Sequence, residues 1–251
     1  QLFKQIYGRR VSSWDECSDL SKMFRTQLQF GTELHALELK EKQEAADGTR
    51  KYLFGLHDGQ AIESVLIPDP PRYTLCVSSQ VGCALGCKFC LTGSLGFRRN
   101  LNTAEIVDQI CRVQEDLESA KRITNLVFMG MGEPLANYDA VLRAIQILTD
   151  PNGLDFSHRR ITLSTSGLVP QLYRLGKESP VNLAISLHAP EDALRSELMP
   201  INRTYPLPQL MTACREYPAA PRKRITFEDI LMEGVNDHPR HARGMITLLQ
   251  G

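Results

Sequence analysis

Three cysteines stand within eight residues of this sequence, at Cys83, Cys87 and Cys90. One short loop can direct three such thiolates at one centre, and thiolates are soft ligands that suit iron–sulfur clusters or zinc. A closed structural zinc site takes four protein ligands, commonly from two paired arms, and no second arm lies near this loop in the sequence. The spacing therefore predicts a cubane cluster with one open iron. A zinc site with a remote fourth ligand is the alternative.

The segments that must position this loop predict alternating strands and helices. The expected strands are residues 73–78, 125–129, 160–164, 182–187 and 225–231, and the expected helices begin at Thr103 or cover residues 138–148, 169–175, 207–216 and 238–249. Strands separated by helices pair in parallel, so the fold class is α/β, as a barrel or an open sheet.

A polar or glycine-rich segment lies at or just after the end of each expected strand. These segments are Cys83–Cys90, Gly130–Pro134, Ser164–Gly167, Ser186–His188 and Glu228–Asn236. In α/β barrels the chemistry lies at the carboxyl ends of the strands. We therefore expect the five segments to meet in one pocket of a partial barrel.

Two smaller parts precede this core. Amphipathic spacing predicts helices over residues 1–46, which would form an accessory domain. Alternating apolar residues on both sides of His57–Gln60 predict a β-hairpin within residues 47–70. The remaining residues, 71–251, would form the core domain.

Glu63 lies on the returning strand of this hairpin, where period-two alternation gives it the same face as Val65 and Ile67. One interpretation is a face open to water, which suits most carboxylates. The other is a desolvated general base with a raised pKa. The sequence by itself favours the first interpretation.

The composition is that of a globular protein, with 42% hydrophobic and 23% charged residues and no apolar run of membrane-spanning length. The formal net charge of zero gives no support by itself for nucleic-acid binding. Seven cysteines, three of them clustered, do not resemble a disulfide framework, which favours a reducing cytoplasm. The chain begins without Met and ends inside an expected helix, so we expect a piece of a longer protein.

The CxxxCxxC motif with an aromatic residue, Phe89, before its last cysteine resembles the signature of the radical S-adenosylmethionine (SAM) superfamily. Longer segments resemble one of its families, the RlmN dual-specificity methyltransferases that act on adenine C2 of ribosomal and transfer RNA. These segments are Thr74–Cys83, Thr92–Ile106, Met129–Pro134, Thr162–Gly167 and Ser186–Ala189. The resemblance covers essentially the whole chain.

The resemblance implies a radical SAM (β/α)6 barrel, of which five strands are present here and the last is missing. It also implies a 4Fe–4S cluster and SAM as cofactors, ribosomal RNA and tRNA as substrates, and an electron donor such as flavodoxin. It implies methyl transfer through a 5′-deoxyadenosyl radical and a methylcysteine. The methyl-carrying cysteine of the family lies in a segment beyond residue 251, so we expect this stretch alone to bind the cluster without completing turnover. Arg98 and Arg99, beside the cysteine loop, are the preferred RNA contacts.

The family's residue roles carry over to matching positions only. Gly132 and Glu133 would hold the SAM amino group, although their segment could also be a simple strand-to-helix turn. Ser164 (or Ser166), Ser186, Leu187 and His188 would contact the methionine and ribose parts of SAM, with Phe89 beside the cofactor. Glu63 would be the proton acceptor, and Cys76 would help release the methylated RNA through a disulfide.

Two other functions remain open from the sequence. The related adenine-C8 methyltransferases use similar motifs, and the missing segment prevents a firm exclusion. A non-catalytic RNA-binding module stabilised by zinc is the alternative from another class. The glycine-rich segments at strand ends disfavour it, because such a module does not need them.

Overall fold

An eight-stranded sheet organises the computed structural model, which describes residues 1–118, 121–218 and 224–250. The strand order is β1-β2-β3-β4-β7-β8-β9-β10. The strands are β1 (Glu38–Glu44), β2 (Arg50–Gly55), β3 (Ala61–Asp69), β4 (Arg72–Cys76), β7 (Asn125–Phe128), β8 (Ile161–Thr165), β9 (Asn182–Ser186) and β10 (Thr226–Glu228). From β1 to β4 the neighbours are antiparallel, and from β4 to β10 they are parallel.

The five expected core strands are all present and pair in parallel, which confirms the α/β fold class, although β10 is shorter than predicted. Among the described residues the sheet is open, with β1 and β10 at its two ends, so the barrel stays a prediction. The division into domains at residues 46 and 70 also stays a prediction.

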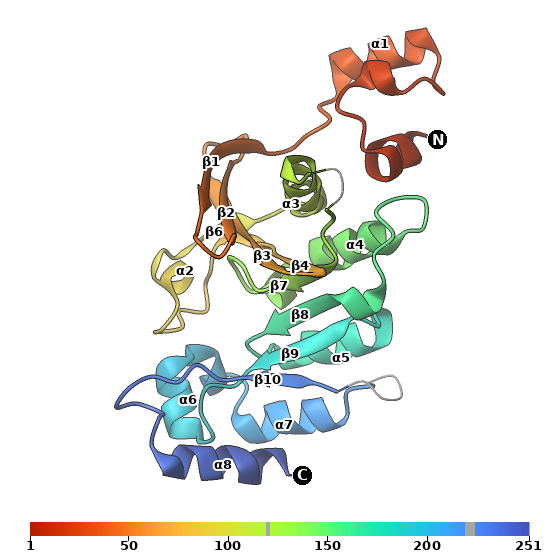
Figure 1. The fold of residues 1–251 in the computed structure, drawn as a ribbon. Coiled ribbons are helices and arrows are strands. Elements are labelled where there is room, and N and C mark those ends of the chain that lie inside the picture. The colour runs from red at the N-terminus through yellow and green to blue at the C-terminus, as the bar shows by residue number, and fades with distance from the viewer. Residues whose placement is uncertain (119–120, 219–223, 251) are drawn as a thin grey trace.

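The connecting helices run along the sheet in chain order (Figure 1). They include α3 (Thr103–Asp116), α4 (Tyr138–Thr149), α5 (Val169–Glu178), α6 (Asp192–Leu198), α7 (Leu207–Arg215) and α8 (Pro239–Leu249), while α1 (Lys22–Gly31), short helical turns at Lys4–Arg9 and Trp14–Glu16, and α2 (Leu91–Ser94) precede them. The parallel strands follow one another in chain order, so right-handed crossovers put the connections on one face of the sheet. The N-cap of the first core helix is Asn102 and not Thr103, where the sequence placed it: Asn102 forms a capping box with Glu105, and the helix begins at Thr103.

The helical prediction for residues 1–46 is wrong over Glu38–Glu44, which form β1. All seven residues of β1 are exposed, and most of them are charged. Glutamate and lysine favour helices in isolation, but pairing with β2 satisfies the backbone here. Charged side chains are also what protects an edge strand from pairing with another chain.

The predicted hairpin is confirmed, with β2 and β3 antiparallel on either side of the turn at residues 56–60. The sequence did not predict a second, two-stranded sheet of β5 (Gln80–Gly82) and β6 (Phe97–Asn100). These two short strands lie immediately before and after the cysteine loop and α2. Their pairing therefore closes the base of the loop that carries the three thiols.

Candidate functional site

The five strand-end segments meet in one cavity of about 340 Å³, as the sequence predicted. Nine of the predicted site residues line it: Cys83, Cys87, Phe89, Cys90, Gly132, Glu133, Ser164, Ser186 and His188. Apolar side chains complete the wall, among them Phe128 and Ile230 near strand ends and Met199 after α6. We call this cavity the strand-end pocket. Polar groups in an apolar concave site are typical of cofactor binding.

The three cysteines reach the pocket from one loop that the backbone holds closed. The N–H of Cys83 donates to Gly96 O at 3.2 Å, and the N–H of Cys90 donates to Cys87 O at 3.1 Å. Burial raises the pKa of Cys83 and, to about 11, that of Cys87. Ligation requires the thiolate, so binding of a metal centre must release these protons.

The donor set fits an iron–sulfur cluster. In the described residues no three or more His, Cys, Asp or Glu side chains are placed to hold a single metal ion. The ligands of a cubane cluster bind separate irons, so such a cluster needs three thiols on one cavity, which is the observed arrangement.

Glu133 is a buried carboxylate, 3% exposed, at the side of the pocket. Its Oε1 accepts a hydrogen bond from the Leu135 N–H at 3.0 Å, and its Oε2 accepts one from the Ser166 N–H at 2.8 Å. Burial raises the pKa of Glu133, against these hydrogen bonds. The side chains of Thr165 and Ser166 also hydrogen-bond to this carboxylate, and rotation of these hydroxyls leaves a lone pair that can accept from an ammonium group.

Gly132 precedes this carboxylate with φ +99°, a conformation that favours glycine. A Cβ at this position would lie 2.5 Å from the Cβ of Gln80. The Gln80 side chain in turn accepts from the Glu133 N–H at 2.8 Å. The glycine is therefore required by close packing of this chain against itself, whatever ligand the pocket holds.

Ser164 and Ser186 lie on neighbouring strands and share one partner that the sequence analysis did not assign. The Ser164 Oγ donates to Glu228 Oε2 at 2.6 Å, and the Ser186 Oγ lies 3.4 Å from the same oxygen. The register places Glu228 beside Ser186. A strand-end segment beginning at Glu228 was the only signal in the sequence. Of the two serine candidates on β8 and its loop, Ser164 and Ser166 both line the pocket.

His188 enters the pocket from a backbone with φ +58°, which is uncommon for a residue with a Cβ. Its Nδ1 accepts from the Ile230 N–H at 3.1 Å, and its ring meets that of Phe89 edge-on at 4.5 Å. Burial, and then the charge of Arg195, lowers the pKa of His188 to about 4. The imidazole is therefore neutral at pH 7.

Three predicted site residues do not line the pocket. Leu187 is buried behind it, and its N–H donates to Glu228 O at 2.9 Å. Cys76 ends β4 beside Val127 of β7, and burial raises its pKa to about 11. The Glu63 side chain is 44% exposed, and its Oε1 lies 3.0 Å from Lys51 Nζ. The desolvated surroundings that one interpretation gave Glu63 are therefore wrong, and its face is open to water.

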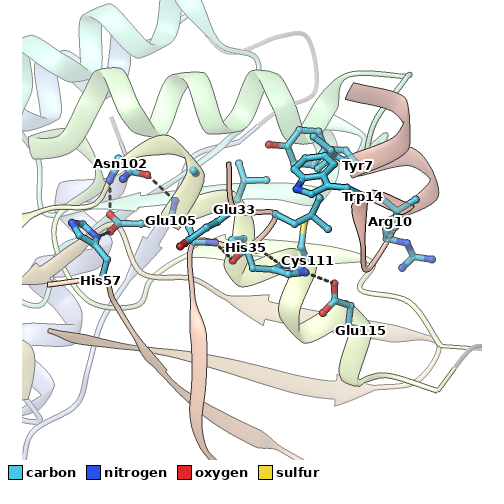
Figure 2. A pocket seen from close by; sticks show the side chains of 17 residues that line it. Tyr7, Arg10, Trp14, Glu33, His35, His57, Asn102, Glu105, Cys111 and Glu115 are labelled. Atoms are coloured by element: carbon cyan, nitrogen blue, oxygen red, sulfur yellow. Dashed lines mark hydrogen bonds and ion pairs between the residues drawn. The ribbon is translucent and has the colours of Figure 1, made fainter. Parts of the chain in front are cut away.

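A second cavity of about 330 Å³ lies between the N-terminal segment and α3 (Figure 2). Trp14 and Tyr7 face it from the short helical turns, and Asp108, Cys111 and Glu115 face it from α3. We call it the α3 cavity. It contains carboxylates and aromatic rings but no cluster of thiols.

The profile of the radical SAM superfamily matches residues 77–243, which contain the whole strand-end pocket. The chain is therefore a radical SAM protein, a class that uses a 4Fe–4S cluster and SAM. Among the described residues, no helix is long and apolar enough to cross a membrane.

Similar proteins identify the family within this superfamily. The dual-specificity RNA methyltransferase RlmN of Syntrophobacter fumaroxidans is 71% identical over this whole chain, which spans 73% of that protein, and the one of Geobacter sulfurreducens is 52% identical over 99% of this chain and 68% of its own length. A crystal structure of a radical SAM methyltransferase from Sphaerobacter thermophilus has a TM-score of 0.95 and 45% identity, over 100% of this chain and 74% of that one. The chain belongs to the RlmN family of SAM-dependent RNA methyltransferases.

Proposed function

We propose that this chain holds a 4Fe–4S cluster on Cys83, Cys87 and Cys90, binds SAM in the strand-end pocket, and serves the methylation of adenine C2 in ribosomal RNA and tRNA. The observation that carries the proposal is the meeting of five strand-end segments around one cavity that three thiols share. The names of the RlmN relatives supply the RNA substrates. The cluster, when bound, supplies an open iron and an electron for SAM.

The residues of the chain bind and orient the cofactor. Glu133 accepts from the SAM ammonium group with a lone pair that its other hydrogen-bond partners leave free. Ser164, Ser186 and His188 contact the methionine and ribose parts, and Phe89 packs beside them. Leu187 contributes through its backbone, since its side chain is buried behind the pocket.

We assign Cys76 and Glu63 to the reaction of the RNA substrate and not to the binding of SAM. Val65 of β3 pairs with Cys76 of β4, so alternation puts Glu63 and Cys76 on the same face of the sheet. Pairing of β4 with β7 continues this face toward the strand-end pocket. Cys76 would release the product, and Glu63 would accept a proton after leaving Lys51.

Of Arg98 and Arg99, the basic pair beside the cysteine loop, we assign an RNA contact to only one. Arg99 binds both oxygens of Glu105 at 2.8 Å and also contacts Asp58, and these bonds raise its pKa. Arg98 is exposed, so it is the phosphate contact we propose. An electron donor of the flavodoxin type and a cytoplasmic location, which suits seven free cysteines, complete the proposal.

The first test is anaerobic reconstitution of the chain with iron and sulfide. We expect iron and sulfide in cluster proportion, and an electron paramagnetic resonance (EPR) signal after reduction that changes when SAM is added. The variant Cys83→Ala/Cys87→Ala/Cys90→Ala should lose the bound iron and sulfide and the EPR signal. Cys214→Ala, on α7 outside the pocket, should keep the iron, the sulfide and the signal. Tightly bound zinc with no response to SAM would favour the zinc-stabilised RNA-binding module instead.

The second test concerns the substrate. RNA treated with SAM, a reductant and the product of the gene that encodes this chain should contain 2-methyladenosine by nucleoside mass spectrometry. Detection of 8-methyladenosine would favour the adenine-C8 alternative. For RNA binding, Arg98→Gln should weaken affinity and reduce the salt slope by about one.

A further inference from the structure

Arg195 of α6 is fully buried, with 0% of its surface exposed. Within the described residues, no carboxylate lies close enough to form an ion pair with its guanidinium. A buried charge without a counter-charge is costly unless hydrogen bonds compensate it. Its position therefore calls for a reason beyond packing.

The compensation comes from the loops that form the strand-end pocket. The Nη2 of Arg195 donates to Ser166 O at 2.8 Å and to Ser186 O at 3.0 Å, and its Nε donates to Leu187 O at 3.1 Å. Ser166 follows β8, whereas Ser186 and Leu187 lie at the end of β9. One planar group thus joins the backbone of two neighbouring strand ends.

Two of these three backbone positions also donate a hydrogen bond to residues that line the pocket. The N–H of Ser166 donates to Glu133 Oε2 at 2.8 Å, and the N–H of Leu187 donates to Glu228 O at 2.9 Å. The next residue, His188, holds the left-handed backbone conformation, which persists only when its surroundings constrain it. The guanidinium supplies such a constraint from behind the pocket wall.

The orientation of Arg195 is itself fixed. Its Nη1 donates to Asn202 Oδ1 at 2.8 Å, and the Asn202 amide donates to Asp192 Oδ1 and Ser196 Oγ, both at 2.8 Å. Asp192 Oδ1 also accepts from the Leu207 N–H at 2.7 Å. The planar, five-donor fork of arginine matches this array, and a lysine ammonium cannot reach it from one point.

We propose that Arg195 is a positioning residue for SAM: it sets the spacing of the β8 and β9 loops and thereby the affinity for SAM, without lining the pocket. The inference rests on the proposed binding of SAM in this pocket. It adds a residue that acts only through main-chain carbonyls, behind the side chains that face the cofactor.

The test compares Arg195→Lys with two controls in the reconstituted chain. Arg174→Lys replaces an exposed arginine of α5, and Leu148→Ala opens the core at the far end of α4 from the pocket. We expect Arg195→Lys to keep its iron content and to raise the Kd for SAM at least about tenfold, since hydrogen bonds to a charged group are lost. Asn202→Ala, which only loosens the guanidinium, should raise it about threefold.

Hydrogen exchange in the metal-free chain gives a second readout that needs no cofactor. At matched loss of melting temperature, the amides of Ser166 and Leu187 should exchange faster in Arg195→Lys than in Leu148→Ala.

An unchanged Kd in Arg195→Lys would overturn the inference, as would an equal rise in Leu148→Ala at matched loss of melting temperature. If the unsubstituted chain takes up the cluster and still binds no SAM, the proposed function fails, and the inference with it.

Discussion

The strand-end pocket and the α3 cavity each contain a buried carboxylate that accepts from two backbone N–H groups. Glu133 uses one oxygen for Leu135 and the other for Ser166. Asp108 uses a single oxygen, Oδ2, for Ala36 and Leu37, at 2.8 and 2.9 Å. Its other oxygen binds His35 Nδ1 at 3.0 Å.

The two carboxylates therefore differ in whether a titrating side chain is among their hydrogen-bond partners. Backbone groups hold Glu133 at the pocket, and backbone carbonyls and the Asn202 amide hold Arg195 behind it, so the arrangement does not depend on a partner that titrates near neutral pH. Beside α3, a histidine lies between Asp108 and Glu115, with 3.5 Å from its Nε2 to Glu115 Oε1 (Figure 2). The hydrogen bonds that shape the pocket therefore do not change with pH near neutrality, whereas the contact between the N-terminal segment and α3 depends on the protonation of His35.

The largest effect should come from Glu133→Gln. A carboxamide has one oxygen, so one of the two backbone N–H groups would face an NH2 group and stay unsatisfied. We expect a loss of about 1–3 kcal/mol in the free energy of unfolding, measured by urea unfolding of the metal-free chain. The Kd for SAM should rise as well, because the acceptor for its ammonium group has lost its charge.

Asp108→Asn is the matched control for that substitution. The amide oxygen can keep both backbone N–H groups, and the NH2 group can donate to His35 in its neutral form. The loss in the free energy of unfolding should therefore stay below about 1 kcal/mol, and the Kd for SAM should not change. Equal losses in the two variants would contradict the distinction between the two carboxylates.

Much of the strand-end pocket could be predicted from the sequence, because its parts are recognisable locally. Buried strands are apolar runs, and the segments after them carry glycines, serines and cysteines at short spacing. Parallel strands bring such segments to one edge whatever the details of the helices. The order of these segments along the chain is therefore enough to assign the three thiols, Glu133 and His188 to one pocket.

The remainder depends on contacts that a sequence does not display. Arg195 lies in a helix of ordinary polar composition, and nothing there distinguishes it from an exposed arginine. The His35–Asp108 contact joins residues 73 positions apart. The charged strand β1 looks helical until its pairing with β2 is known. In each case the tertiary partner decides, and local propensity does not.

A smaller effect should follow pH at the α3 cavity. The hydrogen bond to Asp108, aided by the charges of Asp108 and Glu115 and opposed by burial and by Arg112, raises the pKa of His35 above 6.5. The contribution of this contact to the free energy of unfolding is therefore fully present below pH 6.5. It is lost as the pH rises through the higher pKa that His35 has in the folded state. Trp14, the single tryptophan, lines the same cavity, so its fluorescence reports this contact.

The measurement is the thermal transition of Trp14 fluorescence between about pH 6 and about pH 9, a range that spans the titration of the histidine. We expect the transition temperature to fall with rising pH in the unsubstituted chain. His35→Gln should flatten the profile, because the glutamine cannot titrate. A profile that the variant reproduces would assign the pH dependence to other groups.

The smallest effect should come from Glu63→Gln. Glu63 and Lys51 are both substantially exposed, and an exposed ion pair of this kind contributes little. We expect the free energy of unfolding to change by less than about 0.5 kcal/mol, and the Kd for SAM to stay the same, because Glu63 lies outside the strand-end pocket. A weaker affinity for SAM would instead extend that pocket along the sheet face that Glu63 shares with Cys76. Retained SAM binding with a loss of RNA methylation in the gene product would place Glu63 on the RNA side, where its partner among the described residues is the exposed side chain of Lys51.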